Sequence, residues 1–350
     1  MKKTALYQDH LKDKAKMIDF FGWSMPVSYM GIIQEHRQVR SSCGLFDVSH
    51  MGILDVNGTQ AEDFLQYLTI NDVACLKSGR SQYTMMCNNE GTILDDMICT
   101  RYEQYFRLVV NCSNFEKIIQ WMRTWQEKQF EKVNIIHRQD LSIIALQGPR
   151  TLHFLDTLFE GECPEKSFHV RQGLLNGIPV DISRTGYTGE CGVELFVDNE
   201  KAEQVWTFCR QQGIMPVGLG ARDTLRIEAG LPLYGHEIFP GISPFDIGYG
   251  WIVKLDKGDF IGRKALTVVK EERKYLYGID IQDRIIPRQG CEVGTFGQVT
   301  SGTFAPSLNR PVAMMISKDR KQVGSPVTIK VRKHQLPGVI KELPFVKKGC

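Results

Sequence analysis

The 350-residue sequence lacks any apolar run near the roughly 20 residues that a membrane-spanning helix needs, so it predicts no membrane partner. It also lacks a strong charge of either sign, with a net charge of only +3. No dense run of lysine and arginine appears, which argues against a nucleic-acid partner. The basic segment 341–348 is short and is interpreted as a solvated end. No apolar stretch follows Lys2 and Lys3, so we predict no signal peptide.

Ten cysteines are present, but no Cys-x-x-Cys pair and no histidine at metal-ligand spacing accompany them. We therefore predict no metal site. Scattered cysteines without a signal peptide are typical of reduced thiols, and we expect a cytoplasmic location. The sequence also has no repeat of 20–50 residues and no low-complexity linker, so any domains should pack closely together.

The apolar pattern mixes helix and strand along the chain. It predicts a helix over 115–132, and strands over 93–100, 105–111 and 193–197. After about residue 275, short β-like runs alternate with Gly and Pro, which indicates a small antiparallel β domain at the C-terminal end. The predicted fold class is α+β.

The segment 218–235 is the most informative part of the sequence. Two glycines lead into an apolar helix and Gly230 closes it, which is typical of a close backbone approach followed by a glycine cap. Arg222 and Arg226 are four residues apart and share a helical face. A pair of guanidinium groups suits an anionic ligand, but a structural salt-bridge cluster fits the same spacing.

Asp95 and Asp96 lie side by side within a predicted strand, where neighbouring side chains point to opposite faces. A buried member of this pair is a candidate general acid or base, or an anchor for a ligand. The alternative is that both are solvated turn residues.

Two further motifs have both a structural and a functional interpretation. Asp47, Ser49 and His50 are close in sequence, but hydrolase triads are assembled from distant segments, so we favour a fold-building or pocket-lining role. The glycine-rich stretch 186–192 lacks the Gly-Lys-Ser/Thr of a phosphate loop and predicts a tight hairpin. Glu194 then projects from a fixed wall, or else faces solvent from its strand.

Seven motifs in order give the sequence a resemblance to a known family. They are Phe21-Gly-Trp-x-Met-Pro26, Phe46-Asp-Val-Ser-His-Met51, Asp95-Asp96, Leu146-Gln-Gly-Pro149, Gly186-Tyr-Thr-Gly-Glu190, Gly218-Leu-Gly-Ala-Arg-Asp-Thr-Leu-Arg-x-Glu-Ala-Gly230 and Thr300-Ser-Gly302. Together they resemble aminomethyltransferase, the T-protein of the glycine cleavage system. The resemblance runs from about residue 6 to about residue 346.

The resemblance implies a three-domain ring around a central folate cleft. The implied domains are 1–53 plus 139–240, 54–138 plus 241–275, and the β domain 276–350. It implies a tetrahydrofolate-dependent enzyme of glycine catabolism. The implied partner is the lipoylated carrier H-protein, whose aminomethyl group yields 5,10-methylenetetrahydrofolate and ammonia.

Position by position, the resemblance implies that Asp96 is the key acidic residue near N5 and N10 of folate. It also implies a set of residues that bind folate. Within that set, Glu194 and Arg222 match the family's acidic and basic positions, and other residues line the pterin pocket or the far side of the cleft: Met51, Tyr83, Asn111, Tyr187, Trp251 and Arg288.

Three departures from the family pattern leave a second hypothesis open. Thr92 stands where many members have Gly, and a stiff Thr side chain disfavours a positive φ. Cys191 stands where Asp is common, and the sequence stops at Cys350, where many members continue. The alternative function is therefore a folate- or carrier-binding homologue with reduced or no transfer activity.

Overall fold

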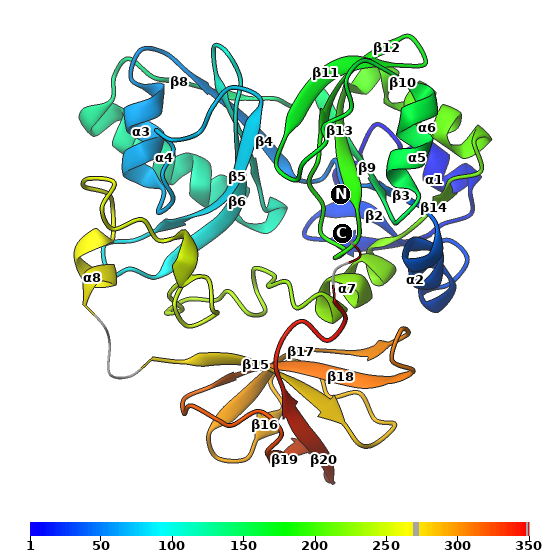
Figure 1. Ribbon diagram of the computed structural model, residues 1–350, viewed down its shortest axis with the longest axis vertical. Coiled ribbons are helices and arrows are strands. Elements are labelled where there is room, and N and C mark those ends of the chain that lie inside the picture. Colours follow the sequence, from blue (N-terminus) through cyan, green and yellow to red (C-terminus); the bar gives the residue numbers. More distant parts are fainter. Residues whose placement is uncertain (269–272, 348, 350) are drawn as a thin grey trace.

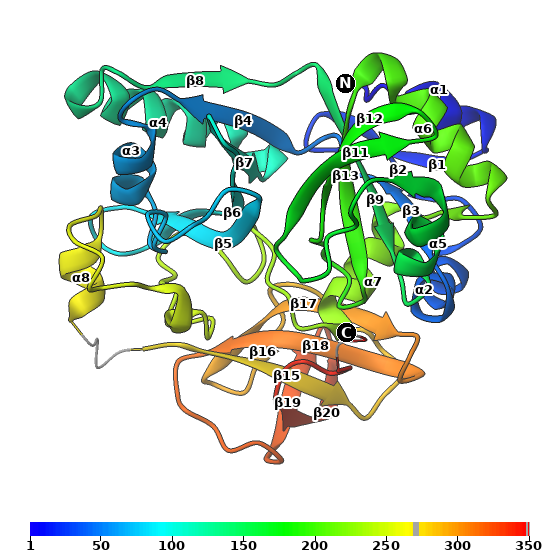
Figure 2. The ribbon, with the colours of Figure 1, turned by 45° about the horizontal axis from the view of Figure 1, so that its top comes forward.

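The computed structural model describes residues 1–268, 273–347 and 349, so parts of the predicted segments 241–275, 341–348 and 276–350, and Cys350, lie outside the described residues. A seven-stranded sheet, a five-stranded sheet and a β-barrel stand at three corners of the molecule (Figure 1). Figure 2 shows the same arrangement after a turn, with the barrel below both sheets. No helix among the described residues is long and apolar enough to cross a membrane.

The seven-stranded sheet combines early and late parts of the chain. Its order is β10-β11-β12-β13-β9-β3-β14, and only β14 and β3 pair in parallel. The strands are β3 (Gly44–Asp47), β9 (Leu141–Gln147), β10 (Phe159–Glu160), β11 (Val170–Leu175), β12 (Ile178–Ser183), β13 (Gly192–Asp198) and β14 (Met215–Pro216).

Helices and one hairpin accompany this sheet. They are α1 (Tyr7–Lys12), the hairpin β1 (Lys16–Phe20) and β2 (Trp23–Ser28), α2 (Ile32–Ser41), α5 (Thr151–Leu158), α6 (Asn199–Gln211) and α7 (Leu219–Glu228). Apolar side chains of α6, among them Val205 and Trp206, pack in one core with strand residues such as Leu195.

The five-stranded sheet has the order β5-β6-β7-β4-β8 and is antiparallel throughout. Its core includes Phe64 of α3 and Met122 of α4. The elements are β4 (Gly52–Asn57), α3 (Ala61–Leu68), β5 (Arg80–Cys87), β6 (Ile93–Arg101), β7 (Phe106–Val110), the 3-10 helix η1 (Cys112–Asn114), α4 (Phe115–Gln129) and β8 (Asn134–His137).

A connecting region and the closed barrel complete the fold. The connection holds η2 (Gly250–Ile252) and α8 (Arg263–Thr267). The barrel strands are β15 (Tyr275–Ile281), β16 (Glu292–Val293), β17 (Gly297–Ala305), β18 (Arg310–Ser317), β19 (Pro326–Val331) and β20 (His334–Lys341). The predicted α+β class with a C-terminal antiparallel β domain is confirmed, whereas the domain boundaries stay a prediction.

Cysteine chemistry departs from the sequence-based expectation at one position. Among the residues that the structure describes, eight cysteines carry free thiols, four of them buried: Cys43, Cys75, Cys87, Cys99, Cys112, Cys163, Cys209 and Cys291. Cys191 is disulfide-bonded, so the prediction of reduced thiols throughout is wrong at that residue.

Candidate active site

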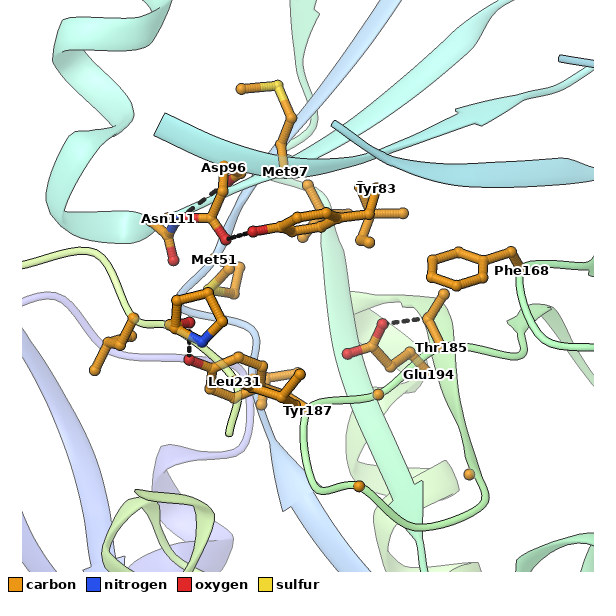
Figure 3. A pocket seen from close by; sticks show the side chains of 18 of the residues that line it. Met51, Tyr83, Asp96, Met97, Asn111, Phe168, Thr185, Tyr187, Glu194 and Leu231 are labelled. Atoms are coloured by element: carbon orange, nitrogen blue, oxygen red, sulfur yellow. Dashed lines mark hydrogen bonds between the residues drawn. The ribbon is translucent and has the colours of Figure 1, made fainter. Parts of the chain in front are cut away.

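A cavity of about 360 Å³ lies where the two sheets and α7 meet. Eight of the nine residues singled out from the sequence line it, and all but Arg222 and Trp251 are labelled in Figure 3. They are Met51, Tyr83, Asp96, Asn111, Tyr187, Glu194, Arg222 and Trp251. The sequence thus predicted which side chains share one space, although they come from segments up to 200 residues apart.

Asp96 projects into the cavity from β6, and both of its carboxyl oxygens are held. The Tyr83 hydroxyl donates to Oδ2 at 2.9 Å, and the Asn111 amide donates to Oδ1 at 2.9 Å. Burial raises the pKa of Asp96, although these two hydrogen bonds oppose the rise. Asp95, the neighbouring strand residue, is fully buried, so the alternative of two solvated turn aspartates is wrong.

Glu194 lies on β13 across the cavity from Asp96 and accepts a hydrogen bond from the Thr185 hydroxyl (Figure 3). Burial raises the pKa of Glu194, while the Thr185 hydrogen bond and the charge of Arg222 oppose the rise. The interpretation of Glu194 as a wall residue therefore fits the structure, and the alternative of a solvent-facing strand residue does not.

The glycine-rich loop 186–192 joins β12 to β13 as the predicted hairpin. Its glycines are required because Gln147 fills the space beneath it. A Cβ atom on Gly186 would lie 2.0 Å from the Gln147 side chain, and one on Gly192 would lie 2.4 Å away. Gln147 Nε2 donates to the carbonyls of Thr185 and Val193 at 3.1 and 3.2 Å. The motif 146–149 thus supports the loop that lines the cavity.

Helix α7 begins and ends as the glycine pattern predicts. A Cβ atom on Gly218 would lie 2.4 Å from the backbone of Val27, and Gly230 has a φ of 67°. The Gly218 amide donates to the buried carboxylate of Glu35 at 2.8 Å. These contacts fix the first turn of α7 against β2, which aims the helix at the cavity.

The two arginines of α7 have different roles. Arg226 is 1% exposed and forms ion pairs with Glu237 at 2.7 Å and Asp223 at 2.8 Å, so the salt-bridge interpretation holds for it. Arg222 instead lines the cavity with its guanidinium 4.6 Å from the centre of the Tyr187 ring. Within residues 1–268, 273–347 and 349, Arg222 has no carboxylate partner. The guanidinium of Arg222 can therefore bind an anionic or polar group of a ligand in the cavity.

Aromatic rings form the remaining wall. Tyr83 and Tyr249 lie 5.4 Å apart between ring centres, and Tyr249 and Trp251 lie 6.3 Å apart. Trp251 is 66% exposed although it lines the cavity, so it stands at the rim. Sequence analysis missed Tyr249 and Phe168; the Tyr-Gly-Trp spacing offered a weak signal for Tyr249, and nothing marked Phe168.

Arg288 lies outside this group. It is exposed, does not line the cavity, and donates to the Gly302 carbonyl at 3.2 Å. The order of the motifs along the sequence does not indicate how far the segment that carries Arg288 lies from the cavity. The prediction that Arg288 binds folate has no support in this geometry.

The motif at Asp47 builds the fold. Asp47 is buried and accepts hydrogen bonds from Thr4 at 2.6 Å and His10 at 2.8 Å. Ser49 bonds to the backbone of Ile143, and burial lowers the pKa of His50 to about 3. No nucleophile–base pair is formed among these three residues, as the sequence analysis favoured.

Thr92 causes none of the expected strain. The turn between β5 and β6 places Gly91, not Thr92, at a positive φ of 72°, and the Thr92 amide donates to the Asn88 side chain at 2.9 Å. The departure from the family pattern is therefore accommodated locally. No cluster of three or more potential metal ligands occurs in the described part of the chain.

Taken together, the cavity has two half-buried carboxyl groups facing each other, one guanidinium without a counter-ion, and aromatic walls. Such a space suits a flat, polar heteroaromatic ligand, because the walls cover its faces while the fixed polar groups bond its edge. Because both carboxyl oxygens of Asp96 are held in place, ligand atoms beside them that gain positive charge can be stabilised.

Comparison with known proteins identifies the class to which this fold and site belong. The family model of the GCVT N-terminal domain matches residues 6–257, and that of the glycine cleavage T-protein C-terminal barrel domain matches residues 274–347. Aminomethyltransferase from Chlorobium luteolum is 44% identical over 99% of both chains, and that from Halothermothrix orenii is 42% identical over 99% of this chain and all of the other.

A solved structure indicates the same family. The crystal structure of glycine cleavage system aminomethyltransferase T from Bartonella henselae superposes with a TM-score of 0.91 at 33% identity, over 99% of this chain and 98% of that one. The chain therefore belongs to the glycine cleavage T-protein family. The resemblance drawn from seven motifs is confirmed, as is the prediction of a transferase of this family.

Proposed function

We propose that this protein moves the methylene of an aminomethyl group from a lipoylated H-protein carrier to tetrahydrofolate, with release of ammonia. The observation that carries the proposal is the cavity itself, in which Asp96, Glu194 and Arg222 converge from three different elements. The aminomethyltransferase name of full-length relatives at 42–44% identity supports the same reaction. We further propose a cytoplasmic location.

Tetrahydrofolate fits the residues that line the cavity. A pterin ring is flat and carries donors and acceptors along its edge, which matches the tyrosine walls and the carboxyl group of Glu194. The unpaired guanidinium of Arg222 suits an anionic or carbonyl group of the ligand. Tetrahydrofolate supplies the nucleophilic amine of the transfer.

Asp96 has the electrostatic role in this proposal. Its carboxyl group is held by Tyr83 and Asn111 before the ligand arrives, so no reorganisation is needed when positive charge develops on the attacking amine. The same group is within reach to take part in proton transfer. Holding the carrier arm and the folate in one cavity supplies a further part of the rate.

The alternative of a binding protein without transfer activity loses one of its reasons, because Thr92 does not strain the loop before β6. A coupled assay separates the two functions. Lipoylated, aminomethyl-loaded H-protein is mixed with tetrahydrofolate and the protein, and methylenetetrahydrofolate and ammonia are measured. Equal amounts of both products are expected. Binding of folate without either product would establish the alternative.

A further inference from the structure

Asp95 is a buried carboxylate for which neither the resemblance nor the cavity provides a role. It neighbours Asp96 on β6, so its side chain points to the opposite face of the sheet. It is 0% exposed and does not line the cavity. A buried carboxylate without an arginine or lysine partner is costly to keep, so its contacts are informative.

Three donors hold Asp95. Its Oδ1 accepts from the side-chain amides of Asn111 at 2.8 Å and Asn114 at 3.1 Å, and its Oδ2 accepts from the backbone amide of Asn111 at 3.2 Å. Two of these donors belong to Asn111, the residue between β7 and η1. Asp95 therefore fixes both the backbone and the side chain of Asn111.

The Asn111 amide bridges the two aspartates. Its Nδ2 lies 2.8 Å from Asp95 Oδ1 and 2.9 Å from Asp96 Oδ1. Because a side-chain amide has two hydrogens, one can serve each carboxyl group. Rotation of Asn111 away from Asp95 would also withdraw it from Asp96, which would then lose one of its two side-chain donors and keep the hydrogen bond from Tyr83.

We propose that Asp95 is a positioning residue that acts through Asn111 to fix the carboxyl group of Asp96 toward the cavity. Its contribution to transfer rests on the function proposed above, but the positioning itself is a property of the protein without any ligand. The pair then behaves as one unit, in which the state of one carboxyl group affects the other.

Electrostatics support this coupling. Burial and the adjacent charge of Asp96 raise the pKa of Asp95, and burial also raises that of Asp96. Because the charge of Asp96 raises the pKa of Asp95, Asp96 ionises first and Asp95 is uncharged while Asp96 titrates. The other titratable or charged groups that act on the pair come from β5, η1, the loop 186–192, α7 and the connection before η2: Tyr83, Cys112, Tyr187, Arg222 and Tyr249.

The direct test is the carboxyl titration of Asp96 in the full-length, ligand-free protein, followed by carbon-13 NMR of labelled aspartate. The Asp96 signal is assigned by its loss in Asp96→Asn. Asp95→Asn releases Asn111 from its position, so the carboxylate of Asp96 loses a donor and the Asp96 midpoint should move to higher pH. An unmoved midpoint in a folded Asp95→Asn protein would overturn the proposal.

Asn111→Ala supplies a second variant should Asp95→Asn fail to fold. It removes a donor to the carboxylate of Asp96, so the Asp96 midpoint should rise. An unchanged midpoint here would equally contradict a bridge through Asn111. Asp55→Asn is the matched control, because Asp55 is a buried carboxylate of the same sheet held by Arg107 and lines no part of the cavity.

Transfer kinetics complete the test. Asp95→Asn should lower kcat by roughly 10- to 100-fold, the effect of one misplaced hydrogen bond to a charged group, with little change in KM for tetrahydrofolate. The acid limb of its pH profile should move to higher pH, unlike that of Asp55→Asn. Absence of transfer by the wild type would contradict the proposed function, whereas an unmoved Asp96 midpoint contradicts only this inference.

Discussion

Asp96 is the residue whose removal should affect turnover most. Asp96→Asn keeps the shape of the side chain but removes the charge that, in the proposed reaction, stabilises the developing cation. We expect turnover to fall roughly 100-fold or more, the scale of a lost preorganised electrostatic group, while folate affinity falls less. Steady-state kinetics with a separate folate-binding titration measure the two effects. Near-native turnover in Asp96→Asn would contradict the role assigned to this carboxyl group.

Arg222 tests whether the cavity needs a planar guanidinium. Arg222→Lys keeps the charge but loses the fork of donors and the stacking on Tyr187, so activity should drop markedly and Lys should rescue little relative to Arg222→Ala. Arg310→Lys on the barrel, where Arg310 pairs with Asp280, is the control and should behave as wild type. If Arg222→Lys matched wild type in rate and in folate affinity, the proposed contact would be wrong.

At the residue scale, the sequence predicted which side chains line the cavity better than it predicted where each one lies and what it contacts. The alternation rule separated Asp95 from Asp96, but only the structure showed which face holds the cavity and that Asn111 joins them. Phe168 has a φ of 62° and lines the rim, which no local pattern indicated. Arg288 does not line the cavity, because its position relative to the cavity depends on how the barrel packs, and its role in binding folate stays a prediction.

Helix α7 shows how one element connects the cavity to the barrel. Its cavity side presents Arg222, while the buried Arg226 donates to Ser301 of β17 at 2.7 Å and pairs with Glu237. The glycine signals predicted the helix and its end. They did not separate the two arginines, because each helical position faces a different neighbour that only tertiary packing supplies.

The Arg226–Glu237 pair should make the fold sensitive to acid. Burial alone raises the pKa of Glu237, but Arg226 and the hydroxyls of Ser301 and Thr300 outweigh it, so the net pKa is lowered. A lowered folded-state pKa stabilises the protein above the unfolded value near 4.3, and this contribution disappears as pH falls through the folded pKa.

Denaturant unfolding between pH 7 and pH 3 measures this effect. The free energy of unfolding of the wild type should fall below about pH 4.5. Glu237→Gln should cost roughly 3 kcal/mol at pH 7, because Arg226 loses its buried charged partner and keeps only the exposed Asp223, and should show a shallower fall in acid. An identical pH dependence in both proteins would contradict the account of this pair.

Other elements were predicted nearly as they are, with errors at their ends. The predicted helix 115–132 ends at Gln129, and the predicted strand 93–100 extends to Arg101. Periodicity identifies an element because it reports which face is buried, but it does not specify where the last hydrogen bond forms.

The whole molecule could be predicted only through the family resemblance. Strand β3 pairs with β9 almost 100 residues later, and β14 adds to β3 in parallel, so one sheet is built from distant segments. Composition indicated a small antiparallel β domain at the C-terminal end, since its short strands are local, but did not indicate that these strands close into a barrel. No local signal predicts long-range pairing, and the cavity exists only because the two sheets and α7 meet.

Tetrahydrofolate should therefore stabilise the whole fold, because it binds only when these parts are assembled. At a hundredfold excess over its dissociation constant, the gain should be roughly 2.7 kcal/mol by mass action. Tyr83→Ala and Glu194→Ala should each reduce the gain, whereas Arg310→Lys should not.

The most direct measurement is a tetrahydrofolate titration of the wild type followed by thermal unfolding, with the same titration of Tyr83→Ala. The account predicts a melting temperature that rises with ligand concentration in the wild type and rises less in Tyr83→Ala at equal concentrations. A wild-type melting temperature that stays constant across the titration would contradict folate binding in this cavity, and with it the proposed transfer.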